Sequence, residues 1–255
     1  MSIFNKIRKT LIPADGLQRY LFYAIGEMLL VVLGILIALQ IDNWNDARKS
    51  KEVEMGYLKN LKRDLEATIT ELDEFIANRK EIVSSADSIV ASYEGRPVRD
   101  WNRFNKQLVT VYSWERFFQI DHTFQEMRSS GNLSIISNPD IKKGLLELDQ
   151  SYKKMKFSED HLRYDCEQCL FEPSYNTQDI RKMADDFHFQ VSGGKGGHQE
   201  NLSAADFKGL LKDQKQKNGF VFVGMYMGGM NSSSGKIIGK CRQLIDLIDA
   251  DLKEK

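Results

Sequence analysis

One apolar stretch, residues 21–41, constrains the fold of this chain more than any other feature. Glu27 is the only acidic or basic residue within it. At about 1.5 Å per residue, a helix of this length spans roughly 30 Å, which matches the hydrocarbon core of a bilayer. Tyr20, Tyr23 and Trp44 lie where interfacial aromatic residues are expected. The stretch therefore predicts a transmembrane helix.

The rest of the 255-residue chain is polar and charged, so we predict a single-pass protein. The predicted organisation is a short N-terminal segment (1–20), the transmembrane helix (21–41) and one soluble domain (42–255). The domain is expected to be a helical bundle, which makes the fold all-α. Lys plus Arg equals Asp plus Glu, at 36 each. Because nucleic-acid surfaces need clustered cationic residues, we expect no nucleic-acid partner.

Lysine and arginine residues favour a cytoplasmic N-terminus under the positive-inside rule. Four precede the span and three follow it closely: Lys6, Arg8, Lys9 and Arg19, then Arg48, Lys49 and Lys51. The apolar run is longer than the core of a signal peptide, and it ends at Gln40-Ile41-Asp42 without a small-x-small cleavage site. We therefore predict an uncleaved signal anchor in the inner (cytoplasmic) membrane, with the C-terminal domain in the periplasm.

One face of the predicted transmembrane helix differs from the others. At 100° per residue, Glu27, Gly34 and Ala38 fall within about 40° of one another. Small residues let helices approach closely, and an ionisable group inside a membrane is expected to face protein or water. We therefore expect this face to bind a second copy of the chain or another membrane protein. In the alternative interpretation, Glu27 extends to the nearby bilayer interface and needs no partner.

Three segments resemble a family of uncharacterised membrane proteins from Bacteroidetes, the DUF6090 type. They are Leu21–Asn45, which ends in Gln-Ile-Asp-Asn-Trp-Asn, then Glu54–Leu65, and Phe124–Leu133. The resemblance implies a single-pass anchor followed by a helical domain. It brings no established activity.

The first helix of the soluble domain is predicted from Asp46 to near Glu94-Gly95, before Pro97. Its apolar residues occupy three positions per heptad, which favours packing against two neighbours in a bundle over a free coiled coil. Three residues interrupt this apolar stripe: Thr68, Arg79 and Ala86.

Two shorter helices are predicted next. Apolar residues recur at three and four positions from Trp101 to Tyr112 or Trp114, and Asp121 can cap a short helix through Arg128, which Gly131 ends. Trp114, Phe117 and Phe118 could form an exposed ligand-binding patch, but aromatic residues at helical spacing belong to a core more often. We therefore place no binding site on them.

A long helix is predicted to start at Asn138-Pro139 and to run up to Pro173. Its apolar spacing misses one step, between Met155 and Leu162. The segment near 174–202 is glycine-rich and is expected to be a flexible loop.

The C-terminal part is predicted to be helical. Ser203 and Asp206 resemble a capping box that opens a short helix through about Lys217. Residues 220–235 read locally as a strand, but the three-four spacing of apolar residues continues through them, and we predict a helix there as well.

Gly235-Lys236 invites comparison with a phosphate-binding loop. That motif needs a glycine where this chain has Met230, and a Ser or Thr where it has Ile237. We therefore predict no nucleotide site of this type and no cofactor.

The three cysteines are Cys166, Cys169 and Cys241. The spacing of the first two, with His188 and His198, matches no common zinc site, and cysteines on a helical apolar stripe are expected to be buried, inert thiols. A disulfide from Cys166 or Cys169 to Cys241 remains an alternative, if the two long C-terminal helices are antiparallel neighbours outside the cytoplasm.

No residue pattern predicts catalysis. The adjacent acids Glu159-Asp160 and Asp185-Asp186 point about 100° apart on a helix, so we interpret both pairs as solvated. We therefore expect a non-enzymatic scaffold, sensory or assembly subunit that oligomerises through its transmembrane helix. The alternative is a membrane-tethered enzyme, or a small-ligand or metal-binding protein, that uses the glycine-rich region with His188 and His198.

Overall fold

The computed structural model describes residues 16–254, and within this range every regular element is a helix, as predicted. The N-terminal residues 1–15, including Lys6, Arg8 and Lys9 of the topology argument, lie outside the described residues. The chain divides into two compact units, Met1–Gly56 and Tyr57–Lys255.

The first unit contains the beginning of helix α2 (Gly16–Tyr93). Its large apolar side chains between Leu21 and Ile41 are exposed. Among the described residues, α2 is the one helix long and apolar enough to cross a membrane, a test that a signal sequence near the N-terminus also passes. Exposed apolar side chains over such a length are what a lipid environment would accommodate.

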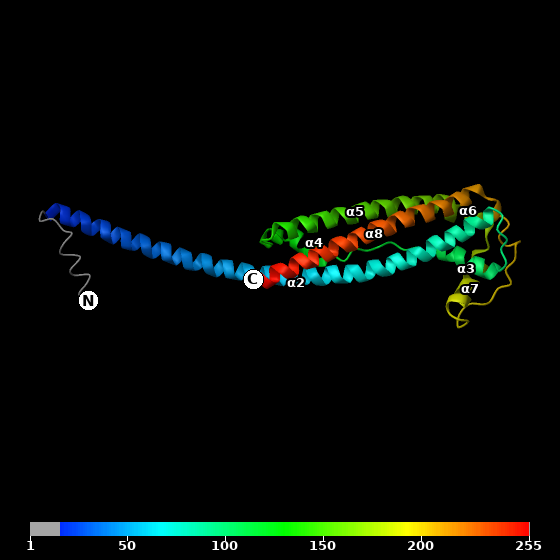
Figure 1. Ribbon diagram of the computed structural model, residues 1–255, viewed down its shortest axis with the longest axis horizontal. Helices are drawn as coiled ribbons and strands as arrows, with labels where there is room; N and C mark the ends of the chain where they lie inside the picture. Colours follow the sequence, from blue (N-terminus) through cyan, green and yellow to red (C-terminus); the bar gives the residue numbers. More distant parts are fainter. Residues whose placement is uncertain (1–15, 255) are drawn as a thin grey trace. The chain divides into compact units, whose positions relative to one another are not determined.

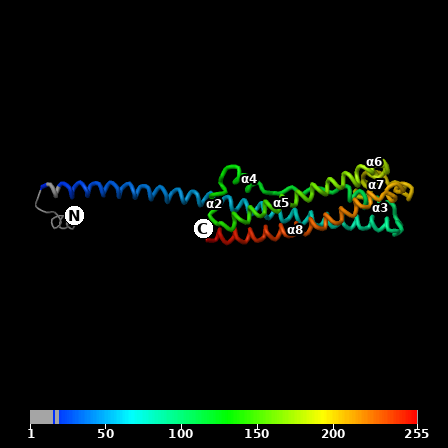
Figure 2. The backbone as a smooth tube through the Cα atoms, turned by 90° about the horizontal axis from the view of Figure 1, so that it is seen from above, coloured from blue at the N-terminus to red at the C-terminus, as the bar shows by residue number. Residues whose placement is uncertain are grey.

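Three long helices lie side by side in the second unit: the remainder of α2, α5 (Pro139–Cys166) and α8 (Gln214–Glu254) (Figures 1 and 2). Lys62 Nζ lies 2.7 Å from Asp249 Oδ1, so the start of α2 in this unit meets the end of α8. These two helices are antiparallel, while α5 runs in the direction of α2. The predicted helical bundle is confirmed.

The chain returns between α2 and α5 by way of helix α3 (Trp101–Tyr112), an irregular segment and helix α4 (His122–Ser129). The irregular segment is hydrogen-bonded to both α5 and α2. Phe117 N–H donates to Glu159 of α5, and the Ile120 carbonyl accepts from Thr68 of α2. Thr68 therefore interrupts the apolar stripe of α2 for a reason. It supplies a hydroxyl to backbone that has no helical partner.

The cap of α4 differs from the prediction. Asp121 precedes the helix, but its carboxylate accepts from the side chains of Gln119 and Gln125. The free N–H of Thr123 instead donates to Asp64 of α2, at 2.8 Å. A residue distant in sequence thus supplies the acceptor that a helix start requires.

Several predicted helix ends are confirmed. α2 ends at Tyr93, and Gly95 follows with φ +95°, a conformation that favours glycine. Asn138 caps α5, with its side chain accepting from Asp140 N–H. α8 is helical through the segment that read locally as a strand.

The prediction of one flexible loop near 174–202 is wrong. A π-helix, η2 (Glu167–Phe171), joins α5 to α6 (Glu172–Thr177), and α7 (Ile180–Val191) follows. The predicted helix from Ser203 to about Lys217 is also wrong, since residues 204–209 are turns, η3 (Leu210–Lys212) is a 3₁₀ helix and α8 starts at Gln214. The glycines that suggested a loop lie after α7, at its C-terminal end.

Two apolar clusters form the core of the second unit. One contains residues of α2, α4, α5 and α8, including Leu58 and Leu145. The other lies where α3, α7 and the end of α2 pack on the start of α8, and it includes Phe104 and Phe220. Of the aromatic residues that we expected in a core, Phe117 belongs to the first cluster and Trp114 packs against the second, whereas Phe118 is 77% exposed and the expectation is wrong there.

Candidate functional site

The predicted interface residues Glu27, Gly34 and Ala38 lie on α2 within the first unit and are exposed. A Cβ built on Gly34 meets no atom within 4 Å, so its lack of a side chain answers no packing need within the described chain. The helix is continuous across all three positions, which places them on one face. Like the other faces of the helix between Leu21 and Ile41, this face is exposed.

In the second unit, two charged residues that interrupt the apolar stripes of α2 and α5 contact each other. Arg79 of α2 and Glu159 of α5 form an ion pair, with side chains only 3% and 2% exposed. Glu159 Oε1 also accepts from Phe117 N–H at 3.2 Å, and the Arg79 guanidinium lies 5.2 Å from the centre of the Phe75 ring. Arg79 Nε and Nη1 are buried without a hydrogen-bond partner.

Burial dominates the electrostatics of this pair. It raises the pKa of Glu159 and lowers the pKa of Arg79, while their mutual attraction acts in the opposite direction on both. Glu159 occupies the position between Met155 and Leu162 where the three-four spacing of α5 would place an apolar residue. The interpretation of Glu159 as a solvated acid is wrong, whereas Asp160 beside it is exposed and pairs with Arg116 at 2.6 Å.

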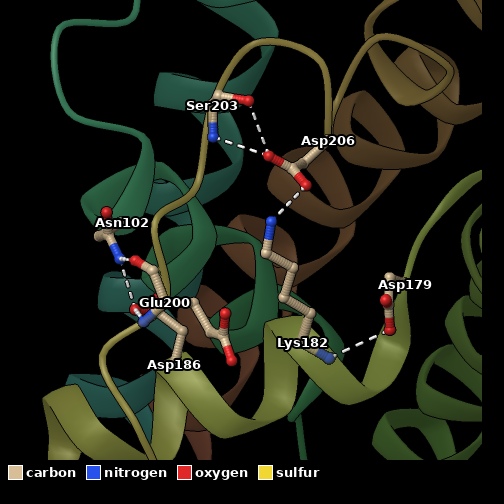
Figure 3. A network of polar contacts seen from close by, with 7 residues as sticks. All are labelled: Asn102, Asp179, Lys182, Asp186, Glu200, Ser203 and Asp206. Carbon is tan, nitrogen blue, oxygen red and sulfur yellow. Dashed lines mark hydrogen bonds and ion pairs between the residues drawn. The ribbon is translucent and has the colours of Figure 1, made fainter.

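A second buried carboxylate, Asp186 of α7, is also contrary to the prediction of a solvated pair. It is fully buried and accepts from Asn102, from Asn105 at 2.8 Å and from Gln190 at 2.7 Å (Figure 3 shows its contact with Asn102). The N–H of Glu200 lies 3.4 Å from its Oδ1. All four donors are amides, and they satisfy the carboxylate where water does not reach.

This network fixes the segment after α7 onto α3. Asn102 Nδ2 lies 2.7 Å from the Glu200 carbonyl as well as against Asp186, and Gln190 donates to the Asn102 carbonyl at 2.8 Å (Figure 3). Both carboxylate oxygens of Asp186 and the amide nitrogens of Asn102, Asn105 and Gln190 are hydrogen-bonded to other parts of the same chain, while Asn105 Oδ1 is buried without a partner. We therefore interpret it as a structural clamp.

Asp206, the predicted partner of Ser203 in a capping box, does accept hydrogen bonds from Ser203, but no helix follows there. Asp206 accepts from both the N–H and the hydroxyl of Ser203 at 2.8 Å, and Lys182 Nζ of α7 lies 2.6 Å from its other oxygen (Figure 3). The hydrogen bond from Lys182 lowers the pKa of Asp206, and Asp206 raises the pKa of Lys182. Asp206 thus joins a turn to α7.

His188 and His198 lie in the glycine-rich region but do not converge. His198 Nδ1 lies 3.0 Å from Asp185 Oδ2, and the His198 side chain is 83% exposed. The His188 ring packs against Gly196, where a built Cβ would lie 2.7 Å from it. Within residues 16–254, no three His, Cys, Asp or Glu side chains gather as metal ligands.

The three cysteines are free thiols. Lys240 Nζ lies 3.1 Å from Ser151 Oγ, which places Cys241 beside that turn of α5. Cys166 follows about 15 residues later on α5, or about 22 Å along the helix. A disulfide needs Cα atoms within about 7 Å, so this pairing does not form although α5 and α8 are antiparallel neighbours. Burial raises the pKa of Cys166 to about 12 and that of Cys241 to about 11.

One family model matches part of the chain. Residues 27–152 match a family of unknown function, DUF6090. The matched range includes Glu27, Gly34 and Ala38, the segment with α3 and α4, and the first half of α5. It ends before Glu159 and the three cysteines. It supports similarity to an uncharacterised family and brings no activity. No curated protein and no solved structure gives a significant match to the chain.

The sequence analysis did not predict that Glu159 and Asp186 are buried and belong to polar networks. For Glu159 a signal existed, because Arg79 and the gap after Met155 each break an apolar stripe. A basic and an acidic residue on two apolar stripes are natural partners. For Asp186 no comparable signal exists, since its three amide partners come from α3 and α7 through tertiary packing.

Proposed function

We propose that this protein is a membrane-anchored, non-enzymatic scaffold, sensory or assembly subunit that oligomerises through its transmembrane helix. The observation that carries the proposal is the exposed face of α2 with Glu27, Gly34 and Ala38. A carboxylate in a bilayer costs several kcal/mol unless it faces protein or water. Small residues one helical turn apart let a second helix approach closely enough to cover it.

The proposed orientation puts the N-terminus in the cytoplasm and the second unit in the periplasm. It is supported by the excess of Lys and Arg before the span. A reporter that is active only outside the cytoplasm, fused after Lys255, should be active. Activity of a reporter that works only inside the cytoplasm would reverse the orientation.

The interior of the second unit supports a structural role. Its buried charged residues, Arg79, Asp149, Glu159 and Asp186, are bound to other groups of the same chain. Such networks fix which helices pair, and they hold no acid or base free to meet a substrate. A scaffold needs a rigid head of this kind.

Oligomerisation is tested on the full-length protein in mild detergent by native mass spectrometry. The wild type should be an oligomer, and Glu27→Leu and Gly34→Leu should each release monomers. Gly26→Leu is the matched control, since it adds the same side chain about 80° around the helix from Gly34. A monomeric wild type, or equal dissociation by Gly26→Leu, contradicts the proposal.

The enzyme or ligand-binding alternative depends on His188 and His198. Alanine at both positions should leave the oligomer and its co-purifying proteins unchanged under the scaffold proposal. If those substitutions instead remove a bound metal or small molecule from the purified protein, the alternative is supported.

A further inference from the structure

A groove lies between α5 and α8, apart from the buried polar networks. Its volume is about 490 Å³, within the range of small-molecule pockets. Lys154 of α5 and Lys236 and Lys240 of α8 line it, and none of the described residues in its lining is acidic. Met155, Met230 and Ile237 form the buried floor of the groove, and Tyr226, which is half-buried, supplies apolar surface beside these cations.

The charge of the groove reflects a wider pattern in the two helices. From 214 to 245, α8 contains five basic residues and no acidic one: Lys215, Lys217, Lys236, Lys240 and Arg242. Residues 150–158 of α5 contain three lysines and no acidic residue. In a chain of zero net charge, this is a local concentration of positive charge.

The three lysines differ in how they are held. Lys240 Nζ lies 3.1 Å from Ser151 Oγ and 3.8 Å from Glu147 Oε2, so its position is fixed from α5. Lys154 and Lys236 are exposed, and within the described part of the chain neither forms an ion pair or a side-chain hydrogen bond. Two ammonium groups are therefore available to an anion beside a third that is already positioned.

Small residues keep the groove open. Gly229 lines it, and a Cβ built there meets no atom within 4 Å. Glycine in a helix interior is unfavourable relative to alanine, and the packing of this unit does not require it at that position. The hydroxyls of Ser158 and Ser233, which also line the groove, donate to carbonyls of their own helices.

We propose that this groove binds a small organic phosphate. Its phosphate groups lie among Lys154, Lys236 and Lys240, and its apolar part lies against Tyr226. Lysine ammonium groups bind phosphate as point charges, and a polyvalent anion gains from three of them at once. The site uses side chains of two packed helices, so it needs no glycine-rich phosphate loop. It does not depend on the oligomer proposed above.

Binding is tested by isothermal titration of the full-length protein in uncharged detergent with inorganic pyrophosphate at low ionic strength. The wild type should bind with a saturable isotherm of one site. Lys154→Gln combined with Lys236→Gln should weaken binding by about tenfold. Lys142→Gln combined with Lys143→Gln removes the same charge from another part of α5 and should change binding little.

A second pair of variants separates the groove from general attraction between charges. Gly229→Leu fills the groove and keeps every charge, so it should remove binding. Gly228→Leu makes the same change at a neighbouring position outside the lining and should bind as the wild type does. Far-ultraviolet circular dichroism confirms that both fold. The proposal is overturned by a wild type without saturable binding, by normal binding to Gly229→Leu, or by equal losses in the two lysine pairs.

Discussion

Among the ion pairs of the described residues, only the pair of Arg79 and Glu159 has both side chains nearly fully buried. Removing both charges from water costs several kcal/mol, and their attraction offsets most of that cost. The pair therefore contributes little net stability. We infer that it selects the alignment of α2 with α5, because any other alignment leaves a charge buried alone.

Removal of one partner exposes this cost. Glu159→Leu leaves the Arg79 guanidinium buried without its anion, and we expect a loss of about 3–5 kcal/mol in the free energy of unfolding. Adding Arg79→Leu should recover most of it, with about 1 kcal/mol still missing because Phe117 N–H has lost its acceptor. Urea unfolding of the three proteins, followed by circular dichroism, measures both values. A double variant as unstable as the single one would contradict the argument.

The thiol of Cys241 makes stability depend on alkaline pH. Burial raises its pKa to about 11, whereas an unfolded cysteine ionises near pH 8.5. Between these values the unfolded chain loses a proton that the folded chain keeps, so stability falls as pH rises through this window. At pH 10.5 the loss in the free energy of unfolding is about 2.5 kcal/mol.

Cys241→Ala tests this dependence. The variant lacks the thiol, so its free energy of unfolding should fall less than that of the wild type between pH 8 and pH 10.5. Buried tyrosines that do not interact with Cys241, such as Tyr93, whose pKa is also raised by burial, contribute equally to both proteins and cancel in the comparison. Identical pH profiles would show that the Cys241 thiol is not protected in the folded state.

At the scale of elements, the glycines of α8 fall into two kinds. A Cβ on Gly219 would lie 2.6 Å from Leu170 Cδ2 and 2.9 Å from Cys169 Cβ, so that glycine allows α8 to approach the π-helix η2. Gly228 has no atom within 4 Å of a built Cβ. One glycine serves packing, and the other only lowers helix stability.

Alanine at these two positions should have opposite effects. Gly228→Ala is expected to stabilise the second unit by about 0.5–1 kcal/mol through helix propensity. Gly219→Ala is expected to destabilise it by about 1–3 kcal/mol through overpacking against Leu170. Thermal unfolding compares the two variants with the wild type. A stabilising Gly219→Ala would mean that α8 and η2 separate easily.

Sequence periodicity predicted the long elements because their apolar stripes repeat over many turns. α2, α5 and α8 all follow from this signal, and Asn138 and Gly95 mark their ends by local chemistry. α7 was missed because its short pattern adjoins a run of glycines. The helix at Ser203 failed because Asp206 satisfies that turn while also binding Lys182, a contact that no local pattern contains.

The same distinction applies to the candidate sites. The face with Glu27, Gly34 and Ala38 follows from helical geometry alone, and the structure leaves it exposed. The groove of Lys154 and Lys236 depends on which helices become neighbours, and a single sequence does not reveal that. The absence of acidic residues from 214 to 245 is nevertheless a property of the sequence itself.

In the whole molecule, the exposed apolar stretch and the buried core belong to different units. Every buried residue of both apolar clusters comes from the second unit, beginning at Leu58. A chain of residues 50–255 keeps about two helical turns before Leu58 and lacks the exposed apolar residues of 21–41. We therefore expect it to fold in water without detergent, with one cooperative thermal transition.

This shortened chain also tests where the full protein assembles. If the face with Glu27, Gly34 and Ala38 makes the oligomer, residues 50–255 should be monomeric in sedimentation equilibrium under conditions where the full-length protein in detergent is not. The Glu27→Leu full-length protein should then match it in oligomeric state, because both lack the same contact. An oligomeric shortened chain would place the interface on the second unit instead, and the glycines of α8 that pack against nothing, such as Gly228, would be the first positions to substitute.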